Sequence, residues 1–180
     1  MKSLVQFIKE SKDPEFDNEN IQALYDYAYG YTNDLNYHFR KGKPKKQDKE
    51  NASKISKLAK PMKLPVLYRS AEWRHFKQDY GIDQNNVFDK IGEVIEDPGF
   101  LSTSTAEEGA WQLNVKDKDN LLIVFKSKGQ HKAININDEL GEYSPSPEQT
   151  EILLDQYTKF KITNVDKDKK GVITITAEIV

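Results

Sequence analysis

The spacing of apolar residues changes near Leu64, and this change does most to limit the fold. Before it, apolar residues recur at intervals of three and four over residues 21–39, which is typical of helices that bury one face. Gly30 is expected to divide this segment into two helices. A third short helix is expected over 52–59, with Pro61 ending it.

After Leu64 the pattern favours short strands. Eight are expected, over residues 65–69, 92–95, 100–103, 121–126, 132–136, 150–154, 159–165 and 172–179, interrupted by two amphipathic helices over 71–79 and 106–113. Helices first and then mainly strands indicate an α+β domain and not a doubly wound sheet. The 180 residues are expected to form one domain over 1–180, helical over 1–63 and mainly strand over 64–180.

Composition excludes several kinds of site. The chain has no cysteine, which removes disulfides and thiolate ligands, and its three histidines share no ligand spacing, so no metal site is expected. Residues 1–10 lack the apolar stretch of a signal peptide, and no segment has the ~20 apolar residues of a membrane span. We expect no membrane partner and a soluble cytoplasmic chain, although a mature toxin without its signal would look the same.

Positive charge is concentrated between Arg40 and Lys63. This segment holds ten Lys or Arg against Asp48 and Glu50. A basic patch of this size can attract nucleic acid through long-range attraction that salt screens. A solvated linker followed by a lysine-faced helix is the simpler interpretation, because the segment has no aromatic residue on which bases stack.

Three short motifs suggest chemistry on a dinucleotide. Arg69 closes an expected strand, where its guanidinium can donate two hydrogen bonds to a pyrophosphate. Residues 102–104 read Ser-Thr-Ser in a strand, so Ser102 and Ser104 share one face. Glu151 opens the run Glu-Ile-Leu-Leu. Each has an ordinary alternative, namely a surface ion pair, hydroxyls that satisfy local backbone groups, and a solvated carboxylate.

Four segments together resemble the ADP-ribosyltransferase exotoxins, in particular the enzymatic components of clostridial and bacillary binary toxins. They are Asn36-Tyr37-His38-Phe39-Arg40-Lys41-Gly42, Leu67-Tyr68-Arg69-Ser70, Phe100-Leu101-Ser102-Thr103-Ser104 and Glu151-Ile152-Leu153-Leu154 with the strand after it. The resemblance implies a split pair of mostly antiparallel sheets that grips NAD in a cleft, with helices outside. NAD would be the substrate, and the chain has no Gly-x-Gly-x-x-Gly or Walker sequence for a Rossmann or P-loop site.

The resemblance also assigns roles to residues. Arg69 would bind NAD, with Ser102 and Ser104 as further NAD-binding candidates. Ser102 would brace the catalytic Glu151, which stabilises the positive charge that develops on the ribose.

The chain departs from the binary toxins at Gln149, where they have Glu. If Thr150 is extended, Gln149 and Glu151 point into one cleft and Glu148 points away. Gln cannot act as a general base but can hydrogen-bond an amide, so the resemblance favours a neutral acceptor such as Asn or Gln over arginine. Tyr143 stands in a Pro-rich loop over 141–147 and would either contact the acceptor or anchor the loop.

These observations predict a mono-ADP-ribosyltransferase that modifies a macromolecule, with a protein side chain favoured as acceptor and the cytoplasm of a target or host cell as a possible place of action. Three alternatives remain open. They are a NAD glycohydrolase, a transferase to nucleic acid guided by the segment Arg40 to Lys63, and a catalytically silent NAD-binding module.

Overall fold

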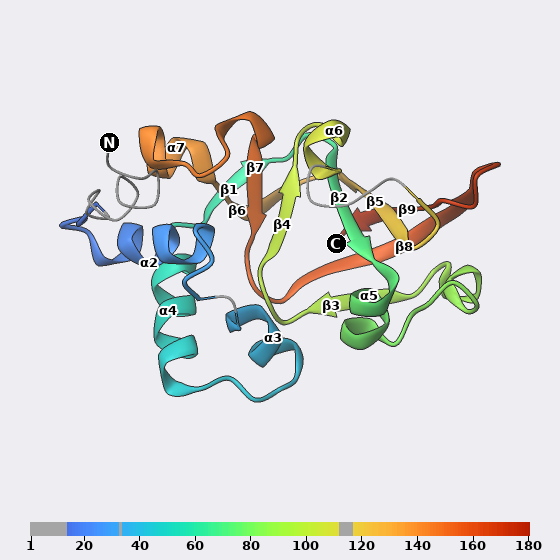
Figure 1. The fold of residues 1–180 in the computed structure, drawn as a ribbon, viewed down its shortest axis with the longest axis horizontal. Helices are drawn as coiled ribbons and strands as arrows, with labels where there is room; N and C mark the ends of the chain where they lie inside the picture. Colours follow the sequence, from blue (N-terminus) through green and yellow to red (C-terminus); the bar gives the residue numbers. More distant parts are fainter. Residues whose placement is uncertain (1–13, 33, 112–116) are drawn as a thin grey trace, which may run out of the picture.

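The computed structural model describes residues 14–32, 34–111 and 117–180 (Figure 1). Among the described residues three helices come before the first strand, α2 (Glu19–Ala28), α3 (Leu35–Arg40) and α4 (Lys46–Ser56). Gly30, with a φ of 79°, lies between the first two, which confirms the expected break. The third helix begins earlier than its apolar residues indicate. The carboxylate of Asp48 accepts a hydrogen bond from the Lys45 N–H at 2.7 Å and so stabilises a polar first turn.

In the part of the chain that the structure describes, nine strands form one sheet in the order β1-β6-β7-β4-β2-β5-β9-β8-β3. Their bounds are β1 (Lys60–Lys63), β2 (Leu67–Glu72), β3 (Val94–Asp97), β4 (Leu101–Ser104), β5 (Asn120–Ser127), β6 (Gln130–Asn135), β7 (Glu151–Leu154), β8 (Thr158–Lys167) and β9 (Ile173–Ile179). Of the strand pairs in residues 14–32, 34–111 and 117–180, only β5 with β9 is parallel, and the other pairs are antiparallel. The α+β class is confirmed.

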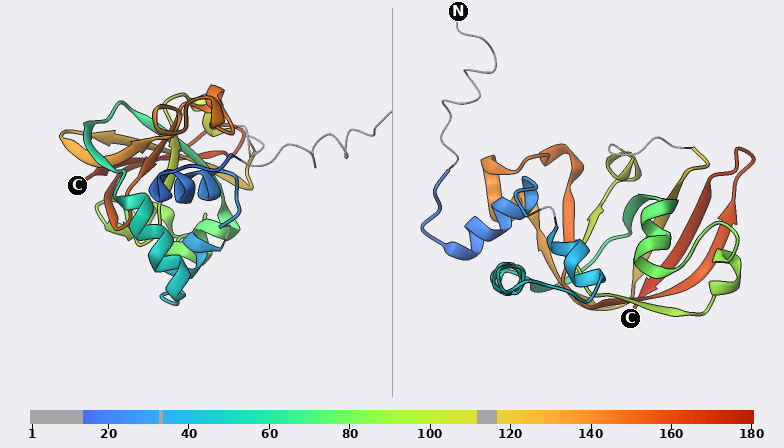
Figure 2. Two further views of the ribbon diagram at one scale, coloured as in Figure 1. Left: turned by 90° about the vertical axis from the view of Figure 1, so that its left-hand side faces the viewer. Right: turned by 60° about the horizontal axis from the view of Figure 1, so that its bottom comes forward.

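The sheet is nearly divided between β2 and β4. These strands share a single residue pair, Tyr68 with Ser104, whereas β2 pairs with β5 through six. The expected pair of sheets is therefore one hydrogen-bonded sheet with two halves. Helices α2, α3 and α4 lie together beside the half that contains β7 and β4, and α5 (Trp73–Tyr80) lies against the other half (Figures 1 and 2).

Two apolar cores lie against the described part of the sheet. The larger core extends over both halves, because Trp73 of α5 and Phe125 of β5 belong to the same cluster as Leu154 of β7. In the smaller core, α2 and α4 bury Leu24 and Ile55 against residues of β6 and β7. The larger core therefore joins the two halves of the sheet, and the smaller core holds the helices on one of them.

Two elements were not expected from the sequence. Strand β1 lies before Leu64, within the part expected to be helical, and Pro61 stands inside it opposite Lys132. Pro and Lys are tolerated there because β1 is an edge strand. Helix α7 (Ile136–Leu140) follows β6 directly, because the Asn135 side chain accepts hydrogen bonds from the next N–H groups and starts the helix.

The remaining elements differ from expectation mainly at their ends. Strand β3 starts at Val94 because Gly92, with a φ of 96°, belongs to the preceding turn. The helix expected over 106–113 appears as α6 (Glu107–Ala110), and its expected end lies outside the described residues. The described residues also contain three short 3-10 helices, η1 (Val87–Lys90), η2 (Gly141–Tyr143) and η3 (Pro147–Gln149).

A buried ion pair connects α3 to the sheet. The Arg40 guanidinium donates hydrogen bonds of 2.9 and 2.8 Å to the two carboxylate oxygens of Asp97, which is fully buried. The Tyr80 hydroxyl and the Gly99 N–H also donate to Asp97, at 2.5 and 2.8 Å. Burial raises the pKa of the Tyr80 hydroxyl, and the charge of Asp97 raises it further. Arg40 is thus a structural residue and no part of an exposed basic patch.

Candidate active site

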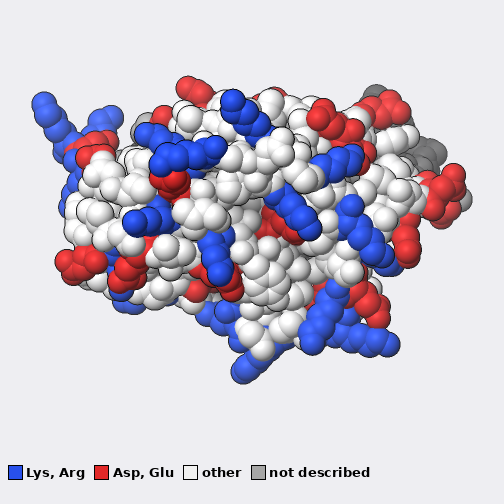
Figure 3. All heavy atoms as spheres, turned by 180° about the vertical axis from the view of Figure 1, so that it is seen from behind, with Lys and Arg blue, Asp and Glu red and all other residues white. Residues whose placement is uncertain are grey.

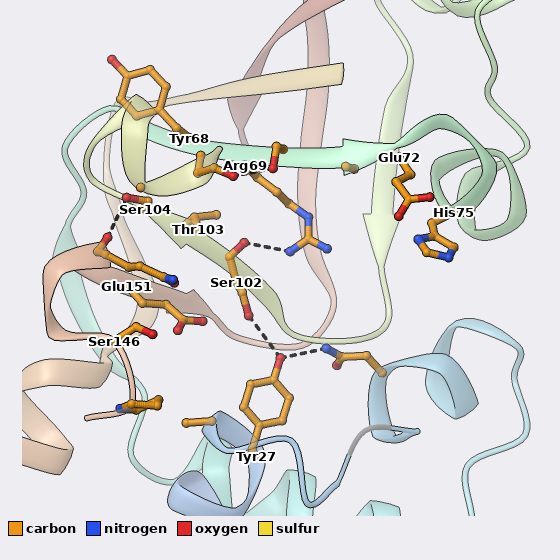
Figure 4. Close-up of a pocket in the computed structure, with 18 of the residues that line it drawn as sticks. Tyr27, Tyr68, Arg69, Glu72, His75, Ser102, Thr103, Ser104, Ser146 and Glu151 are labelled. Atoms are coloured by element: carbon orange, nitrogen blue, oxygen red, sulfur yellow. Dashed lines mark hydrogen bonds between the residues drawn. The ribbon is translucent and has the colours of Figure 1, made fainter. Parts of the chain in front are cut away.

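A cavity of about 530 Å³ lies where the two halves of the sheet meet (Figure 4). Its size is within the range that holds small-molecule ligands. Residues from α2, β2, β4, α5, α6 and the start of β7 line it, including the predicted Arg69, Ser102, Ser104, Gln149 and Glu151. The residues that the sequence singled out for NAD chemistry are therefore brought together in one cavity.

Glu151 and Ser102 lie on the neighbouring strands β7 and β4, and their side chains interact. The register pairs Ser102 with Leu153 and Ser104 with Glu151. Burial raises the pKa of the Glu151 carboxyl above its usual value, while a hydrogen bond from Ser102 and the positive charge of Arg69 lower it in part. The bracing of Glu151 by Ser102 agrees with this contact, and its catalytic effect stays a prediction.

Arg69 lies on β2, across the junction from these two residues. Its Nη1 donates a 2.8 Å hydrogen bond to the Ser102 carbonyl, which links the two halves (Figure 4). Within the described residues the guanidinium forms no ion pair with a carboxylate, so the alternative of a surface salt bridge has no support there. A half-buried guanidinium that faces a cavity is suited to bind an anionic group.

Ser104 is buried and holds the loop before β7. Its hydroxyl donates to the Gln149 carbonyl at 2.6 Å and accepts from the Ala106 N–H at 3.1 Å. Gly109 of α6 packs against this hydroxyl so closely that a Cβ at this position would collide with Oγ. The local backbone contacts of Ser104 match the ordinary interpretation of its hydroxyl, and its role in NAD binding stays a prediction.

The expected extended conformation at Thr150 is wrong. Thr150 has a left-handed backbone, with a φ of 47° and a ψ of 53°, because it closes the 3-10 helix η3. The expected consequence is nevertheless met, since Gln149 and Glu151 both line the cavity. Glu148 is exposed and lies outside the described lining, as the sequence suggested.

Tyr143 anchors the loop that precedes β7. Its ring packs edge to face on the Phe16 ring, with 5.4 Å between the ring centroids, while 42% of the residue stays exposed. In the same loop, Ser144 donates to the Asn137 side chain at 2.6 Å, and Asn137 donates to the Pro147 carbonyl at 2.8 Å. The anchoring role has direct support, and contact of Tyr143 with an acceptor stays a prediction.

Sequence reasoning missed Tyr27, which connects the helices to the site. Its hydroxyl accepts a 2.8 Å hydrogen bond from Asn36 and lies 3.4 Å from the Ser102 hydroxyl (Figure 4). Burial raises the pKa of Tyr27, which keeps the phenol neutral. A signal was available in the sequence, because Tyr27 lies three residues after Leu24 on the apolar face and a buried tyrosine hydroxyl needs a partner.

Glu72 and His75 also line the cavity and were not singled out. They come from the end of β2 and the first turn of α5, on the opposite side of Arg69 from Glu151 (Figure 4). Both follow the Leu-Tyr-Arg motif closely in the sequence. Glu72 reaches the cavity at the end of β2, and the turn of the chain into α5 brings His75 to it.

The basic segment carries a mixed charge environment. Lys54 pairs with Glu19 at 2.9 Å and Lys60 with Glu139 at 2.6 Å, while Arg40 is buried. On the face turned away from Figure 1, basic and acidic side chains are interspersed (Figure 3). These contacts favour the simpler interpretation of the segment over a surface that guides nucleic acid.

Among the described residues, no group of three or more His, Asp or Glu side chains is placed to hold a metal ion. The described helices include none that is long and apolar enough to span a membrane.

Comparison with known proteins identifies the family. The sequence model of the ADP-ribosyltransferase exoenzyme family matches residues 6–180, nearly the whole chain. The chain belongs to this family of NAD-dependent transferases. The comparison with curated protein sequences found no match.

Solved structures of bacterial toxins share the fold. C3stau2 from S. aureus, solved with NAD, has a TM-score of 0.69 at 16% identity over 100% of this chain and 97% of its own. BECa, an ADP-ribosylating toxin of a C. perfringens binary enterotoxin solved with NADH, has a TM-score of 0.69 and 19% sequence identity. The match covers 98% of this chain and 45% of BECa. Exoenzyme S from Pseudomonas aeruginosa, solved with human 14-3-3 protein beta and Carba-NAD, has a TM-score of 0.64 and 20% sequence identity. The match covers 88% of this chain and 72% of exoenzyme S.

Proposed function

We propose that this chain transfers ADP-ribose from NAD to a protein side chain and releases nicotinamide, acting as a single domain. The observation that carries the proposal is the convergence of Arg69, Ser102 and Glu151 on one cavity at the junction of the half-sheets. In a chain of this family, a guanidinium and a braced carboxylate in one cavity match the two charges that NAD cleavage involves.

The proposed chemistry begins with binding. Arg69 holds the pyrophosphate through charge-assisted hydrogen bonds. The bond between the ribose carbon and the nicotinamide nitrogen then breaks, and its electron pair leaves with nicotinamide. The ribose becomes positively charged, and the fixed carboxylate of Glu151 stabilises that charge in the transition state more than in the ground state. The acceptor nucleophile forms the new bond to the ribose carbon and loses its proton.

Gln149 is proposed to contact the acceptor. It lines the same cavity as Glu151, and its backbone carbonyl accepts a 2.6 Å hydrogen bond from the Ser104 hydroxyl. An amide side chain can donate to and accept from a neutral amide but cannot remove a proton from a guanidinium. This difference supports an Asn or Gln side chain as acceptor. Tyr143, exposed on the neighbouring loop, is proposed as a further contact.

A protein acceptor in a target cell fits these features best. Exoenzyme S, which shares the fold, was solved in complex with a human protein. We therefore propose the cytoplasm of a host or target cell as the place of action.

The first experiment compares wild-type protein with Glu151→Gln in a cell lysate that contains labelled NAD. Nicotinamide release and label on protease-sensitive bands are expected to fall by about 100 to 1,000-fold, because one preorganised charged group is lost. Glu148→Gln is the matched control, since Glu148 is exposed and outside the described cavity lining. Unchanged labelling by folded Glu151→Gln would rule out the proposal. Label that only nuclease removes, or free ADP-ribose without label, would indicate one of the alternative functions.

The role of Gln149 is tested with Gln149→Ala in the same lysate. Protein labelling is expected to fall by about tenfold or more, because the acceptor loses its hydrogen-bonding partner. Hydrolysis of NAD by water should change much less. Equal losses of labelling and of hydrolysis would assign Gln149 to NAD cleavage and not to the acceptor.

A further inference from the structure

Four polar side chains form a hydrogen-bonded chain that ends at the candidate catalytic carboxylate. The Asn36 Oδ1 accepts a 2.8 Å hydrogen bond from the Phe100 N–H, and the Asn36 Nδ2 donates a 2.8 Å hydrogen bond to the Tyr27 hydroxyl. That hydroxyl lies 3.4 Å from the Ser102 hydroxyl, which in turn hydrogen-bonds the Glu151 carboxylate (Figure 4). The chain therefore connects α2, α3 and β4 to the start of β7.

The two ends of this chain fix the direction of every hydrogen bond in it. A backbone N–H can only donate, so the Phe100 N–H takes the oxygen of the Asn36 amide and leaves the Nδ2 for Tyr27. At the other end an ionised carboxylate can only accept, so Ser102 donates to Glu151. Among the described partners of Tyr27, the Ser102 oxygen is then the one acceptor for the phenol proton. Each hydroxyl accepts from one neighbour and donates to the next.

Packing holds the first two side chains of the hydrogen-bonded chain. A Cβ at Gly99 would come within 2.8 Å of the Asn36 Oδ1, so the amide lies close against the backbone before β4. The Tyr27 ring packs edge to face on the ring of Phe100, with 5.6 Å between the centroids, and Phe100 is fully buried. These contacts keep the amide and the phenol in the orientations that the hydrogen bonds require.

We propose that Asn36 and Tyr27 are positioning residues that orient the Ser102 hydroxyl as a hydrogen-bond donor to Glu151. A serine hydroxyl can rotate, and one that turned its lone pairs toward the carboxylate would destabilise the ionised form. The proton of Tyr27 occupies a lone pair of Ser102 and so favours the rotamer that donates. The use of this orientation in catalysis rests on the proposed function, in which ionised Glu151 stabilises the charged ribose.

The charged groups around Glu151 act separately from the hydrogen-bonded chain. Burial raises the pKa of the Glu151 carboxyl, and the charge of Arg69 on β2 lowers it in part. Tyr27 faces the carboxylate from α2 and stays neutral, because burial raises the pKa of its phenol. Glu72 and His75 lie on the opposite side of Arg69 (Figure 4). None of these charges fixes which way a hydroxyl points, so variants that reverse the chain can be distinguished from variants that change a charge.

Asn36→Asp tests the direction with almost no change of shape. The new carboxylate can accept from the Phe100 N–H and also from the Tyr27 hydroxyl, so the phenol proton turns away from Ser102. Ser102 then donates to Tyr27 and no longer to Glu151, and the pKa of Glu151 should rise. Tyr27→Phe should raise it by a smaller amount, because Ser102 loses only the group that orients it.

The double variant Asn36→Asp/Tyr27→Phe separates the direction from the new charge. The charge remains in this variant, but the hydroxyl that would pass the reversal to Ser102 is gone. Most of the rise that Asn36→Asp causes in the presence of Tyr27 should therefore be absent when Asn36→Asp is introduced into Tyr27→Phe.

The pKa of Glu151 is measured by an NMR titration of protein labelled at the carboxyl carbons of its glutamates. The resonance is assigned by its loss in Glu151→Gln. Tyr37→Phe is the matched control, since Tyr37 follows Asn36 on α3 and is 49% exposed, and it should leave the titration unchanged. Urea denaturation shows that each variant is folded.

The expected result is a rise in both single variants that is not additive in the double variant, with a matching shift of the acidic limb of kcat/KM for nicotinamide release. The absence of a rise in a folded single variant would overturn the proposal. An equal effect of Asn36→Asp with and without the Tyr27 hydroxyl would overturn it too, because the new charge would then act directly. The titration needs no turnover, so these failures differ from failure of the proposed function, in which the wild-type protein cleaves no NAD.

Discussion

At the scale of single residues, the candidate site depends on how Glu151 is kept ionised in a partly buried place. Burial raises its pKa, and the Ser102 hydrogen bond and the Arg69 charge oppose that effect. A carboxylate that is partly removed from water interacts more strongly with a developing positive charge, but it is also protonated more easily. Ser102 and Arg69 therefore control the pH range in which the site works.

Ser102→Ala should change the pH dependence of nicotinamide release. In the proposed mechanism ionised Glu151 is the active form, so activity is lost as pH falls through its pKa, and this loss begins at higher pH than for an ordinary Glu. Removal of the Ser102 hydroxyl takes away an interaction that lowers this pKa. The acidic limb of the kcat/KM profile is therefore expected to move to higher pH. Ser53→Ala, on the exposed side of α4, should leave the limb in place. A profile that moves to lower pH or not at all would contradict this account.

At the scale of elements, the position of the loop before β7 depends on contacts between segments far apart in the sequence. Helix α6 follows β4, and both contact the loop before β7 through Ser104, Gly109 and Gln149. The left-handed turn at Thr150 completes the arrangement. Gly109 matters here because a larger residue would displace the Ser104 hydroxyl.

Gly109→Ala should therefore impair the site more than the fold. A Cβ at Gly109 would collide with the Ser104 Oγ and come within 3.2 Å of the Gln149 carbonyl. A shift of the loop by about 1 Å is expected to lower nicotinamide release by about 100-fold. Gly129→Ala is the control, since its nearest neighbour would be His131 at 3.9 Å. Steady-state rates and circular dichroism would be compared for both variants. Full activity in Gly109→Ala would show that the loop adjusts without cost.

At the scale of the whole molecule, the helical part and the sheet are connected by buried polar contacts. The ion pair between Arg40 and Asp97 connects α3 to β3, and Tyr27 connects α2 to Ser102 on β4. Apolar packing is divided between two cores, so these contacts add specificity to the relative position of the helices and the cavity.

Asp97→Asn should destabilise the protein strongly. The change removes the fully buried one of the two carboxylates that pair with Arg40, and Asp79 stays 3.2 Å from the guanidinium. Breaking a buried pair in this way costs about 3 to 5 kcal/mol in free energy of unfolding. Urea denaturation would measure the loss. Glu178→Gln breaks an exposed pair with Lys128 and should cost less than about 1 kcal/mol. Similar losses in the two variants would indicate that Arg40 finds another partner.

The order of helices and strands could be predicted from the sequence, because apolar spacing reports local burial. The α+β class and strand β7 followed from it, whereas β1 and α7 did not, since an edge position and a side-chain cap decide them. Element ends were missed where a glycine or a left-handed residue closes a turn, as at Gly92 and Thr150.

By itself the sequence yielded the candidate residues Arg69, Ser102 and Glu151, because the short motifs that hold them, taken together, resemble those of a known family. Only the tertiary structure decided which other groups join them. The single residue pair between β2 and β4 opens the cavity, Tyr27 reaches Ser102 across 75 residues, and the turn into α5 brings in His75. Such contacts depend on pairing between distant segments, which leaves no periodic pattern in the chain.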